Sequence, residues 1–176
     1  LGSGYSSPIV ANEIIYISGR RDTLDVLSAV SIDGNILWET VVVGAWQSSY
    51  PDCRNSPTIE NNRIYISSSM GEVNCLDRET GEVIWRVNAH KDFNSKFGRF
   101  GMAESLLLTE TAVISGPAGE ETALIALNKK DGSLLWKTKS LGDVRGYASP
   151  IMINHNGVNF IIAISSDHVF SVNPDN

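Results

Sequence analysis

Asp77-Arg78-Glu79-Thr80-Gly81-Glu82-Val83-Ile84-Trp85 reads as a tight turn followed by a β-strand, and its pattern occurs three times in the 176-residue chain. The shared feature is a glycine four residues before a tryptophan, which also occurs in the segments 33–38 and 131–136. The three tryptophans stand 47 and 51 residues apart. A pattern that returns at such a period indicates a repeat architecture, in which each copy is one supersecondary unit.

Further anchors extend each repeat. A serine, followed by proline in all copies but one, lies near the start of each unit: Ser7-Pro8, Ser56-Pro57, Ser105-Leu106 and Ser149-Pro150. The third β-rich run of each unit carries a small residue before the final turn: Ala29, Cys75, Ala126 and Ser171. The chain therefore divides into four repeats of one segment over 1–176, at about residues 4–41, 54–88, 103–139 and 147–176. The fourth repeat lacks its outer strand.

Each repeat reads as four antiparallel β-strands joined by tight turns. Turn-forming residues stand in suitable places, for example at Asn61-Asn62 and Asn156-Gly157. The β-branched runs are nearly continuous rather than alternating, which predicts sheets that are covered on both faces. No segment has the period of a long helix. These features predict an all-β fold in which four-stranded antiparallel sheets pack radially as the blades of a β-propeller.

Trp38, Trp85 and Trp136 occupy the same outer-strand position in three successive repeats. A tryptophan side chain buries about 150–250 Å² of surface. We therefore expect these residues to hold neighbouring blades together rather than to stack on a ligand. Trp46 breaks the period and falls in a connection, where we expect it to pack within a loop or to line a rim.

The composition argues against several classes of partner. The chain is 42% hydrophobic and 19% charged, its net charge is -6, and its Lys and Arg residues form no stripe. Nucleic acids and anionic membranes are therefore not the expected partners. No apolar run approaches the roughly 18 residues that a membrane span needs. Cys53 and Cys75 fall toward opposite ends of the predicted sheet, so we expect no disulfide between them.

The 77–85 segment resembles the quinoprotein, or pyrroloquinoline quinone (PQQ), propeller repeat, in which aspartate, a short turn, Thr-Gly and tryptophan recur in every blade. Residues 128–136 are a second similar copy. Residues 100–106 (Phe-Gly-Met-Ala-Glu-Ser-Leu) resemble a longer motif of bacterial members described as polyvinyl-alcohol-dehydrogenase-like. The resemblance covers essentially the whole chain. It implies a ring of about seven or eight blades, completed by the remaining blades of a longer chain or by a second copy.

Candidate binding residues emerge when the four repeats are set in register. Tyr5, Arg54, Ala103 and Tyr147 then fall at one level, and Ser6, Asn55, Glu104 and Ala148 fall one residue further on. Arg145 lies just upstream of Tyr147. The first strand of each propeller blade lines the central channel, so we expect the ligand-binding candidates at or near that channel: Tyr5, Arg54, Asn55, Glu104, Arg145 and Tyr147.

Glu104 stands out because its equivalents are small or neutral. Three roles are open to it: a structural bond, either to an arginine (Arg54 or Arg145) or to strand amides; ligand binding; or a catalytic or metal-linked role. The resemblance raises PQQ and calcium as cofactors, and Glu104 and Asn55 carry oxygens that suit calcium, but a calcium site takes about 6–8 oxygens. Three histidines lie at non-equivalent places without metal-ligand spacing: His90, His155 and His168. The residues thus predict no metal site and identify no catalytic residue.

Two functions from different classes follow. The first is a non-catalytic propeller segment that binds a small molecule, a polymer or a protein, because a fold by itself does not fix an activity. The second is one part of a PQQ-dependent alcohol or sugar dehydrogenase. The resemblance further implies a location in the periplasm or at the cell surface. We expect the first, a ligand- or protein-binding scaffold, and keep the second as the alternative.

Overall fold

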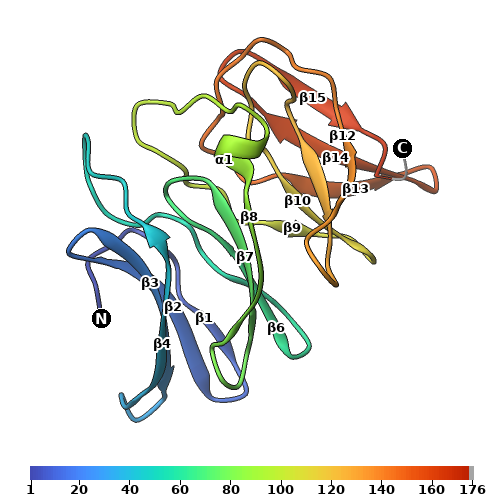
Figure 1. The fold of residues 1–176 in the computed structure, drawn as a ribbon. Coiled ribbons are helices and arrows are strands. Elements are labelled where there is room, and N and C mark those ends of the chain that lie inside the picture. The colour runs from blue at the N-terminus through green and yellow to red at the C-terminus, as the bar shows by residue number, and fades with distance from the viewer. Residues whose placement is uncertain (175–176) are drawn as a thin grey trace.

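The structure is a computed structural model that describes residues 1–174; residues 175 and 176, which end the fourth predicted repeat, lie outside the described residues. In the described part, the strands form four antiparallel sheets. Figure 1 shows these sheets following one another from the blue N-terminal sheet to the red C-terminal sheet. We number them blades 1 to 4 in chain order.

The strands of each blade are hydrogen-bonded in sequence order. Blade 1 contains β1 to β4 (Ile9–Ala11, Ile14–Arg21, Leu24–Ser31 and Ile36–Gly44). Blade 2 contains β5 to β8 (Thr58–Glu60, Arg63–Ser67, Glu72–Asp77 and Val83–Asn88). Blade 3 contains β9 to β12 (Leu107–Leu108, Ala112–Ser115, Ile125–Asn128 and Leu134–Lys137). Within the described residues, blade 4 contains β13 to β15 (Ile151–His155, Val158–Ile164 and Val169–Val172).

Helix is confined, among the described residues, to the single turn α1 (Ala89–Asp92) between blades 2 and 3. The chain from residue 1 to 174 thus contains no helix with the length and apolar character of a membrane span. Asparagine supplies the positive φ in the first hairpin turn of blades 1, 2 and 4, at Asn12, Asn61 and Asn156. Asparagine is one of the few residues besides glycine that adopt this backbone conformation readily, and two of these turns lie at the predicted positions, Asn61-Asn62 and Asn156-Gly157.

Apolar side chains fill the space between successive blades. The cluster between blades 1 and 2 includes Tyr16, Leu27, Trp38, Ile64 and Leu76. The cluster between blades 2 and 3 includes Tyr65, Trp85, Val113, Ile125 and Leu127. The cluster between blades 3 and 4 includes Ile114, Trp136, Ile161, Ala163 and Phe170. The apolar face of each sheet therefore packs against the neighbouring blade, as in the stacked units of a repeat protein.

The tryptophan at the repeated outer-strand position contacts the following blade in the same way at each boundary. The indole Nε1 of Trp38 donates to the carbonyl oxygen of Arg78, at 3.2 Å. Trp85 makes the equivalent bond to Lys129 at 3.0 Å, and Trp136 makes it to Pro174 at 3.1 Å. Arg78 and Lys129 lie in the turn that leads to the outer strand of their blade, and Pro174 follows the third strand of blade 4. One contact thus recurs at all three blade boundaries of the described chain.

The turn glycine of the repeat exists because of the neighbouring tryptophan. A Cβ atom added to Gly81 would lie 2.6 Å from the Trp38 ring, and one added to Gly132 would lie 2.8 Å from the Trp85 ring. Both glycines also have positive φ, at 75° and 76°. Any side chain at these positions would both strain the backbone and collide with the indole, which gives the spacing of glycine and tryptophan a physical cause.

The small residue of each third strand is explained by the strand register. Ala29 lies directly between Tyr16 and Trp38 on the neighbouring strands, and Cys75 lies between Tyr65 and Trp85. Both small residues are fully buried, so a larger side chain would have no room between two aromatic rings. Cys53 and Cys75 are free thiols.

Candidate functional site

The four residues that the register placed at one level are brought together on one surface. Tyr5, Arg54, Ala103 and Tyr147 line a depression of about 600 Å³, together with Tyr50 and Phe100. We call this set the aromatic groove. Its residues come from the connections that enter the first strand of each blade, ahead of β1, β5, β9 and β13. The rings are available for contact, since Tyr5 is 62%, Tyr50 66% and Tyr147 44% exposed.

Arg54 is held in place by backbone oxygens. Its Nη1 donates to the carbonyl oxygens of Asp52 and Phe100, at 3.1 and 3.0 Å, and its Nη2 donates to that of Tyr50. The guanidinium carbon lies 5.3 Å from the centre of the Tyr5 ring, which is a cation–π distance. A fixed positive charge is thus set among aromatic rings.

The rings of the groove also contact one another. The Phe100 ring centre lies 5.8 Å from that of Tyr50 and 5.6 Å from that of Tyr147. The Phe100 amide donates to the Tyr147 hydroxyl at 3.1 Å, and the exposed Arg99 places its guanidinium carbon 5.5 Å from the centre of the Phe100 ring. The groove is therefore a pre-ordered surface of aromatic rings with two arginines.

Asn55 and Glu104, which register also placed near the axis, lie beneath the groove instead of lining it. Asn55 is fully buried, and its Nδ2 donates to the Ser67 hydroxyl at 2.9 Å and to the Glu104 carbonyl oxygen at 3.1 Å. The bond to the Glu104 carbonyl oxygen ties blade 2 to blade 3. Successive residues of an extended segment point in opposite directions, so Asn55 and Glu104, which follow the groove residues Arg54 and Ala103, turn inward.

The Glu104 carboxylate is enclosed within blade 3. It accepts hydrogen bonds from the Ser115 hydroxyl and from the Gly116 amide, the latter at 3.0 and 3.1 Å to the two oxygens. Burial raises the pKa of Glu104, and the charge of Arg145 together with these hydrogen bonds opposes the rise. Among the described residues, the carboxylate makes no direct ion pair with Arg54 or Arg145.

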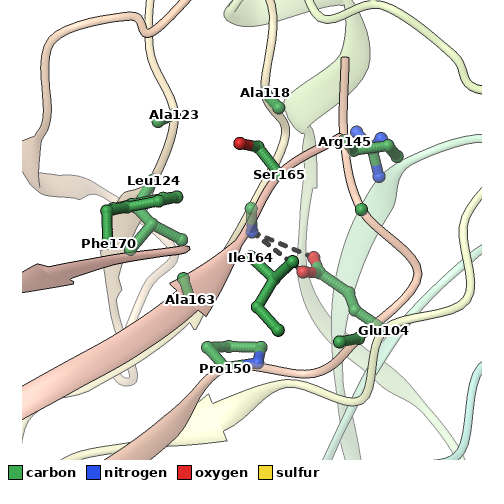
Figure 2. Close-up of a pocket in the computed structure, with 13 residues that line it drawn as sticks. Glu104, Ala118, Ala123, Leu124, Arg145, Pro150, Ala163, Ile164, Ser165 and Phe170 are labelled. Carbon is green, nitrogen blue, oxygen red and sulfur yellow. Dashed lines mark hydrogen bonds between the residues drawn. The ribbon is translucent and has the colours of Figure 1, made fainter. Parts of the chain in front are cut away.

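Arg145 is the second buried charge of this layer. Its Nη2 donates to the Pro117 carbonyl oxygen at 2.8 Å and to the Ser95 hydroxyl at 3.3 Å, while Nε and Nη1 make no hydrogen bond to the described residues. Burial lowers the pKa of Arg145 to about 10. Figure 2 shows Glu104 and Arg145 at the wall of a cavity between blades 3 and 4. Its volume of about 20 Å³ admits one water molecule.

His168 belongs to a separate polar cluster at the edge of blade 4. Its Nδ1 lies 2.7 Å from Asp143 Oδ2, and the Ser165 hydroxyl donates to the same carboxylate oxygen. In an activated serine the hydroxyl would bond the imidazole, with the carboxylate on the far side of the ring. Here both side chains bond the carboxylate. The cluster therefore holds a loop and activates no nucleophile.

The donor chemistry of the groove does not fit calcium or a calcium-bound quinone. Its described polar groups are a guanidinium and phenol hydroxyls, and no carboxylate lines it. Calcium requires about 6–8 oxygen ligands, commonly with carboxylates among them. Within residues 1–174, no group of three or more His, Cys, Asp and Glu side chains is placed to hold a metal ion.

The register identified Tyr5, Arg54 and Tyr147 among the residues that line the groove, and it missed two aromatic rings. Tyr50 and Phe100 lie in connections that differ in length between repeats, so no equivalent position indicated them. The sequence did contain one signal for them, because each is an aromatic residue that lies only a few positions before a groove residue, Arg54 or Ala103. Trp46, the non-periodic tryptophan, is half-buried in a connection, where its ring centre lies 5.4 Å from that of Phe97.

Comparison with known proteins agrees with this architecture. A family model described as Outer membrane protein assembly factor BamB matches residues 23–176. The protein of that name from Legionella pneumophila (strain Paris) is 25% identical over 155 residues, which are 86% of this chain and 36% of that protein. Polyvinylalcohol dehydrogenase from Pseudomonas sp is 27% identical over 143 residues, which are 73% of this chain and 20% of that protein.

A solved structure gives the same fold. Quinohemoprotein alcohol dehydrogenase from Comamonas testosteroni aligns with a TM-score of 0.71 at 16% identity, over 99% of this chain and 34% of that chain. The predicted β-propeller fold and the resemblance to the PQQ repeat family are thus confirmed. The chain spans about a third or less of the length of the curated relatives named here. On the match over residues 23–176, the chain belongs to the family described as outer membrane protein assembly factor BamB.

Proposed function

We propose that this chain is a protein-binding segment of a β-propeller and that the aromatic groove is its recognition surface. The observation that carries the proposal is the convergence of exposed Tyr5, Tyr50 and Tyr147 on the fixed guanidinium of Arg54. Tyrosine and arginine are enriched among the residues that dominate protein interfaces. Rigid aromatic rings contribute contact area at a small cost in conformational entropy.

The charge of the groove indicates the kind of segment that it binds. The whole chain carries a net charge of -6, yet Arg54 and Arg99 lie beside the rings and no carboxylate lines the groove. A partner segment with an acidic side chain next to an aromatic or aliphatic one would complement this surface. The names of the BamB relatives, as outer membrane protein assembly factors, support a protein ligand over a small molecule or polymer. They also support a location outside the cytoplasm, in the periplasm or at the cell surface.

The alternative function, part of a PQQ-dependent alcohol or sugar dehydrogenase, has less support from this chain. The quinohemoprotein match at 16% identity speaks for the fold alone. Glu104 is the carboxylate nearest in sequence to the groove, and its oxygens are engaged by Ser115 and Gly116. A base or a metal ligand at the groove would have to come from other residues.

Selection from a library of short random peptides tests the proposal. We expect selected peptides to combine acidic and apolar residues, and fluorescence anisotropy to show binding that weakens as salt is raised. Tyr5→Ala should reduce affinity by about tenfold or more, because it removes an exposed ring while the backbone bond from Tyr5 to Cys53 remains. Leu135→Ala, which truncates an exposed apolar side chain on β12 outside the groove, is the control and should not change binding.

Two outcomes would contradict this function. Selected peptides that bind equally well to the Tyr5→Ala variant would place recognition elsewhere on the molecule. Displacement of the peptides by PQQ with calcium would favour a cofactor site and the dehydrogenase. The concentrations of PQQ and calcium used must leave the folding of the Leu135→Ala control unchanged.

A further inference from the structure

The residues at the level of the aromatic groove differ in size at one place. Tyr5, Arg54 and Tyr147 carry long side chains, but the fourth residue, Ala103, ends at its Cβ atom. All four line the same depression, so the depression reaches down to Ala103 between the larger side chains that blades 2 and 4 contribute. We call the part of the depression above Ala103 the Ala103 pocket. Ala103 itself is half-buried and forms its floor.

Phe100, three residues before Ala103, joins the two sides of the pocket. Its carbonyl oxygen accepts a hydrogen bond from Arg54 Nη1 at 3.0 Å. Its amide donates to the Tyr147 hydroxyl at 3.1 Å, and the centres of the Phe100 and Tyr147 rings lie 5.6 Å apart. Arg54, Phe100 and Tyr147 are therefore held in fixed positions as one connected wall.

Close packing on both sides of Phe100 keeps this wall in place. A Cβ atom added to Gly98 would collide with the Tyr147 hydroxyl. A Cβ atom added to Gly101 would lie 3.0 Å from the Trp46 ring, and Gly101 also has a positive φ of 71°. The connection thus fits tightly against its neighbours, so the pocket exists before a ligand binds. A preformed pocket lowers the entropic cost of binding.

The chemistry of the wall favours an aromatic ring over an aliphatic side chain. Phe100 and Tyr147 present rings, and aromatic pairs attract one another in edge or offset arrangements with centres about 4.5–7 Å apart. Arg54 supplies a guanidinium, which is attracted to the face of a ring. It already makes such a contact with Tyr5, at 5.3 Å from the ring centre. No carboxylate of the described residues lines the groove to oppose these contacts.

We infer that Ala103 is the specificity-determining residue of the aromatic groove and that its pocket takes one aromatic side chain of a bound protein segment. The inference rests on the proposed function, because it names the side chain that the groove selects in its partner. The ring would lie over the Ala103 methyl group, against Phe100 and Tyr147. An acidic residue beside that ring in the segment would lie toward Arg54 or Arg99, the two cations next to the aromatic rings.

Short capped peptides test the inference on the unmodified chain. Four pentapeptides share one aspartate and differ at the next position, which is phenylalanine, cyclohexylalanine, leucine or alanine. The Ala103 methyl and Phe100 amide resonances of the isotope-labelled chain report binding of each peptide. We expect the phenylalanine peptide to bind with a dissociation constant on the order of 1 mM, about tenfold or more tighter than the alanine peptide. The cyclohexylalanine peptide has a side chain of similar size without a π face, and it should bind about two- to fivefold more weakly than the phenylalanine peptide.

Ala103→Leu fills the pocket and should erase the preference for phenylalanine. The affinity of the phenylalanine peptide should fall by about tenfold, to that of the alanine peptide, because the new side chain would occupy the place of the ring. Ala103→Ser keeps the side chain small, is the matched control, and should retain the preference. Both variants should keep the thermal midpoint of the wild type to within about 2 °C, because the side chain faces the open groove.

Two results would overturn the inference. The first is a wild-type chain that does not prefer the phenylalanine peptide to the cyclohexylalanine, leucine and alanine peptides, whether it binds all of them or none. The second is a preference for phenylalanine that survives Ala103→Leu. The proposed function would fail in a different way, through library peptides that bind Tyr5→Ala as well as the wild type. Library peptides that depend on Tyr5 but show no aromatic preference would leave the groove as the recognition surface and remove only the role of Ala103.

Discussion

Blade 2 and blade 4 are built from similar strands and differ in what lies on either side of them. Ile64 of blade 2 and Ile161 of blade 4 occupy the same position, face the preceding blade, and are both fully buried. The next residue along faces the other way. Tyr65 is buried there by blade 3, whereas Ile162 is only half-buried because the described chain has no fifth blade. A strand's own sequence sets its conformation, and its neighbours determine how much apolar surface it buries.

Truncating the tryptophans should produce the largest effect and tests this comparison directly. Trp85, which is 8% exposed, lies between two four-stranded blades, and Trp85→Ala should cost about 3–5 kcal/mol of unfolding free energy. Trp136→Ala should cost roughly half as much, because Trp136 is only half-buried and packs against the three-stranded blade 4. Urea denaturation followed by circular dichroism measures both. Equal losses would show that blade completeness has no bearing on the boundary.

The turn glycines give a smaller and cleaner contrast. Gly132 and Gly157 have similar φ values, 76° and 81°, but a Cβ atom on Gly132 would collide with Trp85 while one on Gly157 would meet nothing within 4 Å. Gly157→Ala should cost only the backbone strain, about 1–2 kcal/mol. Gly132→Ala should cost a further ~1–3 kcal/mol for the overlap. Thermal denaturation of the two variants measures the difference. Equal thermal midpoints would argue against the close contact between Gly132 and the Trp85 ring.

The buried polar residues beneath the groove, Asn55 and Glu104, give a third comparison. Its expected effect on stability is the smallest, and it depends on pH. Asn55 bonds blade 2 to blade 3 without a charge, whereas Glu104, at the equivalent position, brings a carboxylate to the boundary with blade 4. Because burial raises the pKa of Glu104, the folded state holds its proton more tightly than the unfolded state does. Stability therefore falls as pH rises from the unfolded carboxyl pKa of about 4.3 through the raised folded value.

Glu104→Gln should remove that part of the pH dependence. The urea midpoints of the wild type and the variant should converge toward acidic pH, and the wild type should lose ground relative to the variant as pH rises. Glu110→Gln, which changes an exposed carboxyl in the same blade, is the control and should follow the wild type. A difference between the wild type and Glu104→Gln that stays constant with pH would mean that the two states bind this proton equally.

The fold was readable from the sequence because each blade repeats its own constraints. Glycine before tryptophan and the small residue of the third strand both answer to contacts with an indole ring, and the asparagine turns supply the positive φ of three hairpins. The part of the groove that follows this register, Tyr5, Arg54 and Tyr147, was therefore predictable as a set.

Other features depend on the irregular connections and on side-chain direction, which a repeat register does not encode. Tyr50 and Phe100 join the groove from loops of unequal length. Asn55 and Glu104 sit at the expected level but point into the blade boundary, where Ser67, Ser115 and Gly116 meet them. The roles of all six candidate residues in binding remain proposals that the peptide experiment addresses.

The two buried thiols can be used to follow local unfolding of the molecule. Desolvation raises the pKa of Cys53 to about 12 and that of Cys75 to about 11, so neither is a reactive thiolate in the closed protein near neutral pH. Cys75 sits within the sheet of blade 2, and Cys53 sits where the chain leaves blade 1 for blade 2. An alkylating reagent would therefore label each cysteine only when the region around that cysteine unfolds transiently. Mass spectrometry of the labelled peptides would measure the labelling rate of each cysteine, and hence the local opening of each region, without an engineered probe.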